Sequence, residues 1–497
     1  MGVTGLWKIL DDLDLGETKD LSSLSGKRIA VDTSGWVVQA NTTKGLNESR
    51  APYLRNVFFR ANQLLKNGIL PIFVLEGKVP PLKEAAFKDR NHQGTSQSST
   101  IGRAKFDRIL NECKTLLQSL GVPCIKSSGE AEALCSFLYI NKIVDAVMTE
   151  DSDAFLYGAD IVLRGFTANE QESHFKEYSL KSLKNTLDLD QEKLIALALL
   201  LGCDYDEDGV PGIGKETAIK FLSELNGYDP LKRFLEWKQK GESEIYPGYD
   251  SSIKKQGVHC KQCNHLGCLS EHSTTGCTMC KSEISCFPSD GKNLCSCAFH
   301  KTQEIRLHHK AELKIYHAAR EKPNFPNLEI VKEFKNYDDK TPDNSELEWD
   351  CPNLEKFQME TLKFLRWSSE DSHKKVFSLI TLWQQLQLSQ NNISSDRLLY
   401  KPVKIVKKRT KNGKGCFEVQ WSKTGEDVSD ASLTNLCTIE IEDKFKVAYP
   451  ELSEEFYNLN TAKNETKAKA KSPKNANKNK KMTEFYSATK HAKRARK

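Results

Sequence analysis

The sequence predicts an α/β protein built on a mainly parallel sheet that is flanked by helices and followed by smaller modules. Two observations support this prediction. Over residues 1–201, short apolar runs that are typical of buried strands alternate with segments of helical apolar spacing. Three of the apolar runs lead into a carboxylate, and sites in parallel sheets form at the carboxyl ends of the strands.

The expected elements follow one another in a regular order. Four strands are expected at 27–31, 69–77, 121–126 and 143–149. Helices are expected at 53–67, 130–140, 191–201, 302–320 and 354–367. Residues 92–102 are polar and rich in Gly and Ser, which predicts a loop. From about residue 400 the pattern alternates as in strands, with "KNGKG" as a hairpin turn.

Composition and charge exclude some classes of protein. The 497 residues are 38% hydrophobic, which is enough for a sizeable core. No run of about 18 apolar residues occurs, so we expect no membrane span, and the acidic first 20 residues predict no signal peptide. The net charge of +6 includes +11 from residues 461–497, so the other 460 residues carry −5. Affinity for nucleic acid must therefore come from local basic patches.

Acidic side chains gather around the predicted strand ends. Mg²⁺ prefers oxygen ligands, and two such ions about 4 Å apart can promote hydrolysis of a phosphodiester. Because like charges raise one another's pKa, a cluster of acids is stable only with cations nearby. For each acid taken singly, an exposed surface position is the alternative. The candidate metal ligands are Asp32, Glu76, Glu130, Glu132, Asp151, Asp153 and Asp204.

The spacing within two acidic pairs decides whether their members can converge. On a regular helix Glu130 and Glu132 point about 200° apart, so convergence requires Glu130 to lie at or before the first turn. Asp151 and Asp153 follow a strand, in which residues i and i+2 point the same way. We expect both pairs to face the metal site.

Five ordered motifs resemble those of the flap endonuclease/XPG family of structure-selective nucleases. They are "AVDTSGW", "FVLEGKVPPLK", "GEAEALC", "TEDSDAFLYG" and "LLGCDY…GVPGIGKETA", all within residues 1–225. The resemblance implies a PIN-like nuclease core and a phosphodiesterase that uses two Mg²⁺ per active site. All seven acidic positions of the family are filled, with Glu76 where many members have Asp. Glu150 has no counterpart, and we expect it outside the metal site.

Lys83 and Arg90 are the expected catalytic residues that act on the scissile phosphate. They lie seven residues apart, hence on one helix face, and they follow "EGKVPP" directly. By resemblance they are the arch residues that steady the phosphate, Lys83 as a point charge and Arg90 as a planar fork. Arg103 and Lys105 are weaker candidates. A solvated charged helix is the alternative.

The segment "GVPGIGKETA" predicts a turn that opens a helix at about Lys215. Its glycines let backbone N–H groups approach a DNA phosphate at the helix N-terminus. By resemblance this is the helix–two-turn–helix that grips duplex DNA and whose carbonyl groups hold K⁺. Gly212, Gly214 and Lys215 are the expected DNA contacts.

Eight of the 15 cysteines lie between residues 260 and 297, and without a secretory signal they indicate a reducing compartment. Two CxxC pairs separated by 13 residues have a spacing that suits a structural, tetrahedral Zn²⁺ site. This set consists of Cys260, Cys263, Cys277 and Cys280. A second set could consist of Cys268, Cys286, Cys295, Cys297 and His300. A thiol-rich loop without metal is the alternative.

Residues 398–457 resemble a chromodomain through "KPVKIVKKR…NGKGCFEVQWSK". Reading of methyl-lysine by an aromatic cage that contains Tyr400 and Trp421 is the weaker option. The basic residues would extend a DNA-binding surface; they are Lys404, Lys407, Lys408 and Arg409. A nuclease core with a cysteine insert and a chromodomain-like module is most similar to the Gen-type, Holliday-junction-resolving branch of the family.

The last residues are rich in Lys, Asn and Ala and have little to bury, so we expect disorder from about residue 460. Within them "NKKMTEFY" places Met482, Phe485 and Tyr486 at the apolar positions of a motif that binds the sliding clamp PCNA. Asn479 stands where that motif usually has Gln. "KHAKRARK" indicates a nuclear localisation signal or a phosphate-binding tail, and we expect a nuclear protein.

Six regions are therefore expected along the chain. They are an N-terminal nuclease region (1–98), an internal nuclease region with the helix–two-turn–helix (99–250), a zinc-binding insert (255–300), a helical continuation of the core (301–395), the chromodomain-like module (398–457) and a disordered basic tail (460–497).

The predicted function is that of a Mg²⁺-dependent endonuclease that cuts 5′ flaps and resolves Holliday junctions in DNA repair and recombination. We expect a monomer in the free state and a dimer on the junction. Two alternatives stay open. One is a replication-associated flap endonuclease, which the clamp-binding motif favours. The other is a non-catalytic DNA- or chromatin-binding protein.

Overall fold

The structure is a computed structural model that describes most of the chain. The chain forms two compact units, Met1–Ser369 and Glu370–Lys497. Arg90, most of the predicted loop at 92–102, the motif around Met482, Phe485 and Tyr486, and "KHAKRARK" lie outside the described residues. The described residues are 2–42, 50–84, 86, 102–168, 173–253, 257–281, 283, 286, 295, 297–394, 397–411, 413–424 and 436–469.

The first unit is built around a seven-stranded sheet in the order β1-β7-β6-β5-β2-β3-β4. The strands are β1 (Glu17–Asp20), β2 (Arg28–Asp32), β3 (Leu70–Leu75), β4 (Cys124–Lys126), β5 (Ala146–Met148), β6 (Ile161–Arg164) and β7 (His174–Ser179). The strands from β6 to β4 run parallel, and β7 and β1 add an antiparallel edge. The predicted mainly parallel sheet is confirmed, and β2 to β5 are the four predicted strands.

The central strands form because nearly all of their residues are apolar. Ile29, Ala30 and Val31 of β2 are fully buried, as a strand that is covered on both faces requires. Strand β7, which lies between β1 and β6, instead mixes buried and exposed residues, so a search for apolar runs does not find it.

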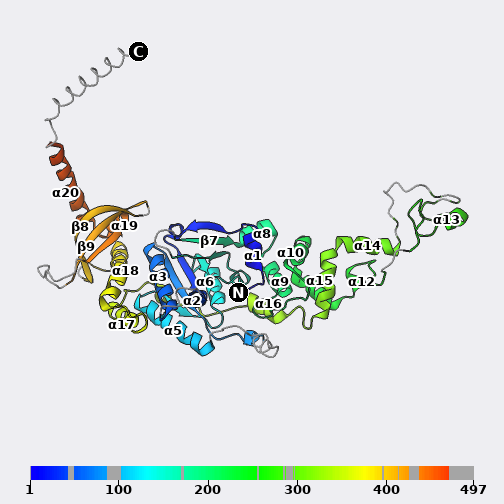
Figure 1. Cartoon of the computed structure of the whole chain (residues 1–497), viewed down its shortest axis with the longest axis horizontal. Coiled ribbons are helices and arrows are strands. Elements are labelled where there is room, and N and C mark those ends of the chain that lie inside the picture. The colour runs from blue at the N-terminus through cyan, green and yellow to red at the C-terminus, as the bar shows by residue number, and fades with distance from the viewer. Residues whose placement is uncertain are drawn as a thin grey trace, which may run out of the picture. The chain divides into compact units, whose positions relative to one another are not determined.

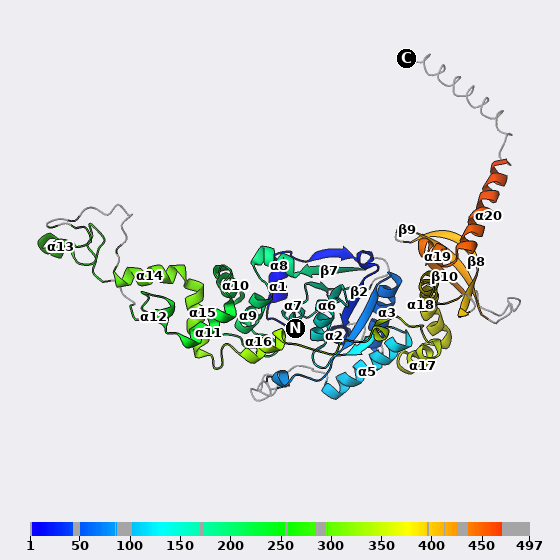
Figure 2. The same ribbon diagram turned by 180° about the vertical axis from the view of Figure 1, so that it is seen from behind.

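Helices cover both faces of this sheet. Figures 1 and 2 show the strands between α3 on one side and α6 on the other. In α9 every residue from Lys193 to Leu201 is buried, which makes it the expected core helix. The helices are α1 (Leu6–Asp12), α2 (Thr33–Thr42), α3 (Pro52–Lys66), α5 (Arg103–Ser119), α6 (Ala131–Ile140), α7 (Asp153–Leu156), α8 (Leu180–Leu187), α9 (Gln191–Leu201), α10 (Lys215–Glu224), α11 (Pro230–Gln239), α12 (Glu242–Ile245), α13 (Leu269–Thr275), α14 (Ala298–His308), α15 (Lys310–Glu321), α16 (Leu328–Lys335) and α17 (Leu354–Leu365). Among the described helices, none combines the length and the apolar character that crossing a membrane would require.

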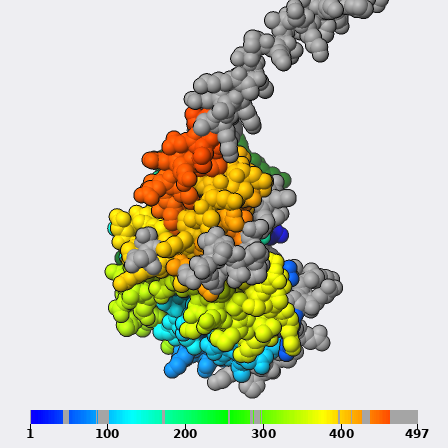
Figure 3. Space-filling model, turned by 90° about the vertical axis from the view of Figure 1, so that its left-hand side faces the viewer, coloured from blue at the N-terminus to red at the C-terminus, as the bar shows by residue number. Residues whose placement is uncertain are grey.

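The second unit is a three-stranded antiparallel sheet in the order β10-β9-β8, packed with three described helices. Figure 3 shows the orange to red elements of this unit packed against one another. Its elements are α18 (Ser369–Ser389), β8 (Tyr400–Lys411), β9 (Lys414–Lys423), β10 (Leu436–Ile441), α19 (Glu442–Ala448) and α20 (Pro450–Lys469).

Helix α18 belongs to this second unit, whereas the sequence predicted that the helical continuation of the core would run to residue 395. The ring of Phe377 on α18 lies 4.8 Å from the ring of Tyr400 and 6.5 Å from that of Trp421. Gln384 Nε2 donates to the carbonyl oxygen of Tyr400 at 2.9 Å. The helix therefore completes the core of the β module, because three strands alone leave one face uncovered.

Tyr400 and Trp421, which were considered for a methyl-lysine cage, fill the interior. They are only 4% and 3% exposed, and Trp421 Nε1 donates to Thr438 Oγ1 at 2.6 Å. These two rings therefore do not form an open cage.

The region beyond residue 460 also differs from the expectation, because α20 continues to Lys469. The rings of Phe456 and Tyr457 pack 5.5 and 6.2 Å from the ring of Phe417, and this contact anchors the first turns of the helix. Helix formation is cooperative, so an anchored first part extends into residues that have little to bury.

We expect Trp421→Ala to destabilise the second unit by about 3–5 kcal/mol, because removing a buried ring leaves a cavity. The measurement is urea unfolding followed by circular dichroism. Val406→Ala on β8, where the side chain is 43% exposed, is the matched control and should cost less than about 1 kcal/mol. Equal stabilities of the two variants would contradict a core position for the indole.

Candidate active site

The acidic residues meet where four neighbouring strands end. In the sheet these strands stand in the order β5-β2-β3-β4 and run parallel, so their carboxyl ends lie at one edge. Asp204 joins them from the loop after α9. The strands deliver six acids: Asp32 at the end of β2, Glu76 after β3, Glu130 and Glu132 after β4, and Asp151 and Asp153 after β5.

Glu130 and Glu132 converge because the helix begins between them. Glu130 is the N-cap of α6 and has an extended backbone (φ −69°, ψ 143°), whereas Glu132 lies in the first turn. Carboxylate oxygens of Glu76, Glu130 and Glu132 all lie within 4.8 Å of one another. Glu130 thus lies before the first turn of the helix, as convergence with Glu132 requires. Three hard oxygen donors therefore lie close together.

Asp151 and Asp153 lie close together for a reason other than the predicted one. Strand β5 ends at Met148, and Asp153 is the first residue of α7, so the alternation of a strand does not apply. A tight turn instead lets Asp153 N donate to Asp151 Oδ1 at 3.0 Å. Both residues are buried: Asp151 is 4% exposed and Asp153 is 2% exposed.

Two glycines allow the backbone to approach the acids closely. A Cβ at Gly77 would lie 2.1 Å from the carbonyl oxygen of Ser127, and Gly77 N donates to the carbonyl oxygen of Gly129 at 2.8 Å. This contact holds the loop after β3 against the loop before α6. A Cβ at Gly2, which has a φ of +84°, would lie 2.3 Å from Asp151 Oδ1. Only glycine fits either position without displacing an acid-bearing segment.

The side chain of Lys83 places a cation inside the cluster. Its Nζ lies 2.9 Å from Glu130 Oε2 and 3.0 Å from Asp204 Oδ2, and the side chain is only 15% exposed. Burial lowers the pKa of Lys83, but the carboxylates of Glu132, Glu130 and Asp204 outweigh burial and raise the pKa well above its ordinary value. The ammonium group therefore stays charged and links two sides of the cluster.

Burial also dominates the electrostatics of the acids. Burial, with a smaller contribution from neighbouring carboxylates, raises the pKa of Glu76 to about 8 and that of Asp151 to about 7. Burial likewise raises the pKa of three more carboxyl groups: Asp32, Glu132 and Asp153. Glu130 Oε1 and Asp153 Oδ1 are buried without a hydrogen-bond partner among the described residues. Carboxylate oxygens without a partner are the hard donors that Mg²⁺ prefers, so the cluster fits a Mg²⁺ site.

Hydroxyl groups that the sequence analysis did not single out orient the acids. Thr149 Oγ1 donates to Asp32 Oδ2 at 2.9 Å and accepts from Asp151 N at 3.0 Å. Ser34 Oγ donates to Glu76 Oε2 at 3.2 Å. A hydroxyl residue next to an acid at a strand end is the signal that could have identified both.

A buried tyrosine pair braces two of the acid-bearing segments. Tyr157 Oη and Tyr205 Oη lie 2.7 Å apart, and they lie 3.4 and 3.5 Å from Glu333 Oε1 on α16. Tyr157 follows α7, which begins with Asp153, and Tyr205 follows Asp204. Glu333 is 128 positions away from Tyr205, so no local motif could have revealed it.

Glu150 lies outside the cluster, as expected. Its Oε2 lies 3.3 Å from Arg164 Nε, and its Oε1 accepts from Gly165 N at 3.0 Å. The carbonyl oxygen of Glu150 accepts from Trp7 Nε1 at 2.9 Å. Glu150, the first acid of "TEDSD", thus anchors neighbouring backbone and side chains instead of joining the acid cluster.

Arg103 and Lys105 begin α5, beyond the predicted arch. Arg103 donates to the carbonyl oxygen of Gly77 and pairs with Asp107 Oδ1 at 3.2 Å, while Lys105 is exposed. Arg103 therefore fixes the loop that follows Glu76.

The predicted DNA-contact segment forms an open helix N-terminus. Helix α10 begins at Lys215, and its N-cap Gly214 provides no side-chain capping bond. A Cβ at Gly212 or Gly214 would meet nothing within 4 Å, so the backbone there is accessible. Lys215 Nζ pairs with Asp12 Oδ2 at 2.9 Å and is partly exposed. Backbone N–H groups in this setting can bind an anion.

Among its described residues, the cysteine-rich insert holds three groups of Cys and His side chains that could each bind a metal ion. Cys260 and Cys277 belong to different groups, so the single four-cysteine set expected from spacing is not formed. The spacing predicted the wrong ligand set because His265 and His272 lie between the two CxxC pairs, and each completes a separate group. Cys268, expected in a second set, caps α13. The groups are Cys260, Cys263, His272 and Cys286; Cys263, His265, Cys277 and Cys280; and His259, Cys295, Cys297 and His300.

Comparison with known families defines the class to which this fold and site belong. The family model of the XPG N-terminal domain matches residues 1–97, and that of the XPG I-region matches residues 121–204. Together the two ranges contain all seven clustered acids. The model of chromatin organization modifier domain 2 matches residues 401–458, within the second unit. The first unit is therefore of the XPG class.

Relatives that match most of this chain identify the family within this class. Flap endonuclease GEN homolog 1 of Homo sapiens is 37% identical over 462 residues, which cover 91% of this chain and 50% of the human protein. Flap endonuclease GEN-like 1 of Arabidopsis thaliana is 31% identical over 455 residues, which cover 85% of this chain and 75% of the plant protein. The chain belongs to the GEN family of flap endonucleases.

A solved structure agrees with this assignment. The crystal structure of human GEN1 in complex with Holliday junction DNA matches with a TM-score of 0.69 and 30% sequence identity, over 94% of this chain and 100% of that chain. The chain spans about half the length of the human and mouse relatives that it matches.

We expect the stability of the chain in EDTA to fall as the pH rises from about 5 to about 8.5. Folding raises the pKa of Glu76 to about 8 and that of Asp151 to about 7, so it favours their neutral forms. Below about pH 4 the two carboxyl groups are protonated in the folded and the unfolded state, and their contribution to stability is fully present. This contribution is lost as the pH rises through the folded pKa values. Each such carboxyl group contributes up to about 1.4 kcal/mol per pH unit.

The measurement is the melting temperature across this pH range, with and without Mg²⁺. Mg²⁺ should raise the melting temperature more at pH 8.5 than at pH 5, because protons compete with the metal ion for the carboxylates. Asp151→Asn should flatten the pH dependence in EDTA. A melting temperature in EDTA that is independent of pH would contradict the burial of these carboxylates.

Proposed function

We propose that this protein is a Mg²⁺-dependent, structure-selective DNA endonuclease that cuts 5′ flaps and resolves Holliday junctions by phosphodiester hydrolysis. The observation that carries the proposal is the placement of seven acids at or beside the carboxyl ends of neighbouring strands. Three of them bring oxygens within 4.8 Å of one another, two bury an orphaned oxygen, and the largely buried Lys83 pairs with Glu130. The names of the relatives, and the Holliday junction DNA bound to human GEN1, support the substrate class.

The chain's own groups divide the work at this edge. When bound there, divalent cations supply Lewis-acid activation of a water and of the phosphodiester. Lys83 would release Glu130 and Asp204 as cations enter, and its ammonium would then face the developing charge on a phosphate oxygen. The ligands would be Asp32, Glu76, Glu130 and Glu132 on one side, and Asp151, Asp153 and Asp204 on the other.

Binding of duplex DNA would use groups outside the acid cluster. The N-terminus of α10, with Gly212, Gly214 and Lys215, offers backbone N–H groups and a positive charge to a phosphate. In the second unit β8 presents exposed basic side chains, which would add phosphate contacts: Lys404, Lys407, Lys408 and Arg409.

The remaining partners and cofactors follow from the same proposal. The chain would act as a dimer on a four-way junction and would be a monomer when free. It would work in the nucleus. Its cofactors would be two Mg²⁺ per active site, structural Zn²⁺ in the insert and K⁺ at the helix–two-turn–helix. Binding of the sliding clamp through the motif at Met482, Phe485 and Tyr486 stays a prediction.

The decisive experiment compares Asp151→Asn with Glu150→Gln on matched 5′-flap and four-way-junction DNA. We expect Asp151→Asn to reduce the cleavage rate by about 10²-fold or more while DNA binding stays measurable, because a charged metal ligand is lost. Glu150→Gln, one residue earlier and outside the cluster, should cleave at a rate close to that of the unchanged chain.

The same experiment separates the alternatives. Paired symmetric cuts on the junction support junction resolution, whereas cleavage of the flap alone favours a replication-associated flap endonuclease. Binding without any Mg²⁺-dependent nicking favours a non-catalytic DNA-binding protein. Full cleavage by Asp151→Asn would contradict the metal assignment.

We expect Lys215→Ala to weaken binding of duplex DNA for all sequences and to reduce the slope of log affinity against log salt by about 1. One phosphate contact would be lost without any loss of sequence discrimination. Lys220→Ala, on the same helix and 59% exposed, is the matched control and should leave the slope unchanged. Fluorescence anisotropy at several salt concentrations measures both slopes, and equal slopes for the two variants would contradict the contact.

A further inference from the structure

The cysteine-rich insert buries thiols and imidazoles where other small folds bury apolar side chains. Its core cluster consists of Cys260, Cys263, Cys277 and Cys286, with Cys280 packed against it. His265 and His272 are each 6% exposed. The large apolar residues of the same segment point outward instead: Val258, Leu266, Leu269 and Met279 are 47–69% exposed. The described residues of the insert therefore have no apolar core, so they need another source of stability, and a metal ion is the usual one in a small fold.

The imidazole of His272 is oriented as a metal ligand requires. Its Nε2 lies 2.8 Å from the carbonyl oxygen of Leu266, so the proton sits on that nitrogen. The free lone pair of Nδ1 then points between two sulfurs, at 3.5 Å from Cys263 Sγ and 3.1 Å from Cys286 Sγ. In a tetrahedral zinc site with Zn–S of about 2.3 Å and Zn–N of about 2.0 Å, neighbouring S and N ligands lie about 3.5 Å apart.

The second group repeats this arrangement around His265. Its Nδ1 lies 3.3 Å from Cys280 Sγ and 3.6 Å from Cys277 Sγ. Cys263 is within reach of both groups, because its sulfur lies within 4.8 Å of every ligand atom in each. Two Cys₃His sites therefore need one thiolate in common, and a bridging Cys263 supplies it.

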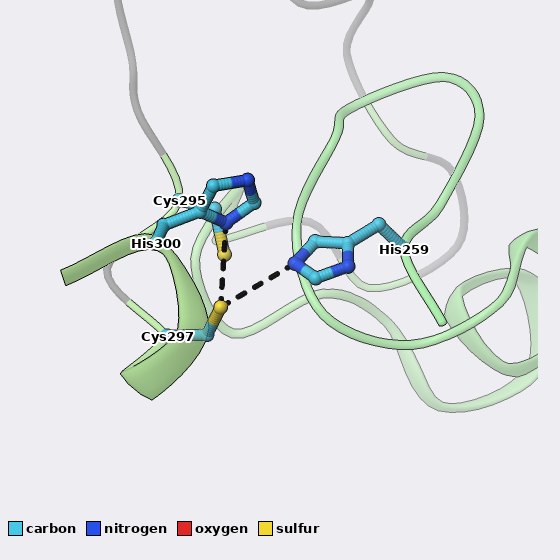
Figure 4. Close-up of side chains that lie close together, drawn as sticks. All are labelled: His259, Cys295, Cys297 and His300. Atoms are coloured by element: carbon cyan, nitrogen blue, oxygen red, sulfur yellow. Dashed lines mark hydrogen bonds between the residues drawn. The ribbon is translucent and has the colours of Figure 1, made fainter. Parts of the chain in front are cut away.

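The third group, which lies at the two ends of the insert, has the same chemistry. Cys297 Sγ lies 3.4 Å from His259 Nε2 and 3.3 Å from His300 Nδ1, and Figure 4 shows these three side chains converging with Cys295. His259 Nδ1 lies 2.6 Å from the carbonyl oxygen of Gly257, which leaves the lone pair of Nε2 for a metal. Two thiols and two imidazoles form a Cys₂His₂ set.

This third set joins the start of the insert to helix α14 at its end. Cys297 is the N-cap of α14 and His300 lies in its first turn, while His259 stands at the start of the insert. A metal here would join residues that are 38 positions apart, and such a closure removes much chain entropy from the unfolded state. A network of S–H···N hydrogen bonds is a poorer account, because it does not require four ligand atoms to gather at each point.

We propose that the insert binds three zinc ions, two in Cys₃His sites that share the thiolate of Cys263 and a third in the site formed by His259, Cys295, Cys297 and His300. The proposal extends the structural zinc of the proposed function from one ion to three, with a different ligand set. It does not depend on nuclease activity, since every ligand lies outside the acidic cluster.

The test counts zinc per chain in the full-length protein by native mass spectrometry and elemental analysis. The unchanged chain should hold three zinc ions. His259→Ala and Cys295→Ser should each leave two, and Cys263→Ser should leave one, because both Cys₃His sites lose a ligand. Cys268→Ser, a cysteine of the same insert that caps α13 and belongs to none of the groups, is the matched control and should keep three.

Titration of the unsubstituted protein with a mercurial reagent, in the presence of a zinc indicator, gives the same count without relying on any variant to fold. Release of three zinc ions supports the proposal, and release of two or fewer overturns it. Loss of a single ion from Cys263→Ser overturns the shared thiolate. Because Asp151→Asn should keep three zinc ions, failure of this proposal and failure of the proposed nuclease function give different results.

Discussion

The constraint on which the first unit depends is the mutual repulsion of buried carboxylates. Glu130 and Asp153 each bury an oxygen that accepts no hydrogen bond within the described part of the chain, and Lys83 offsets only part of the charge. Such an arrangement lowers stability unless cations or protons are bound. The rigid surroundings therefore serve to hold side chains that would otherwise move apart.

The sheet supplies that rigidity through its topology. Parallel strands align their carboxyl ends, and the contact at Gly77 pins the loops after β3 and β4 together. On the other side, the hydrogen-bonded pair of Tyr157 and Tyr205 joins two acid-bearing segments to α16. Each of these two braces acts next to an acid and not on the carboxylate itself, so neither takes up a carboxylate oxygen.

The sequence predicted the parts of the site that depend on chain-local rules. Strand runs that end in Asp32 and Glu76, and a helix that begins just after Glu130, follow from apolar patterning and spacing. The convergence of Asp151 with its neighbour was expected for the wrong reason, because no pattern marked where β5 would stop. Glu333 could not be predicted, because its role depends on packing between distant segments. The extent of the second unit was missed for the same reason.

The spacing of the two CxxC pairs also did not predict which side chains of the insert group together. The thiols of the chain have different surroundings, which set their pKa values. Cys135, beside the acid cluster, is held protonated because burial and then the carboxylate of Asp32 raise its pKa well above the ordinary value. Within the insert the thiols differ. Burial raises the pKa of Cys260, but the backbone N–H groups of Cys263 and Gln262 and the side chain of His272 outweigh it, so that the pKa falls to about 6. In the same group burial raises the pKa of Cys263 to about 11 and that of Cys286 to about 12. Thiolates, and not thiols, bind zinc. The groups of soft thiol and imidazole ligands lie in the insert and the group of hard carboxylates lies at the sheet edge, which would let one chain hold zinc and magnesium at separate sites.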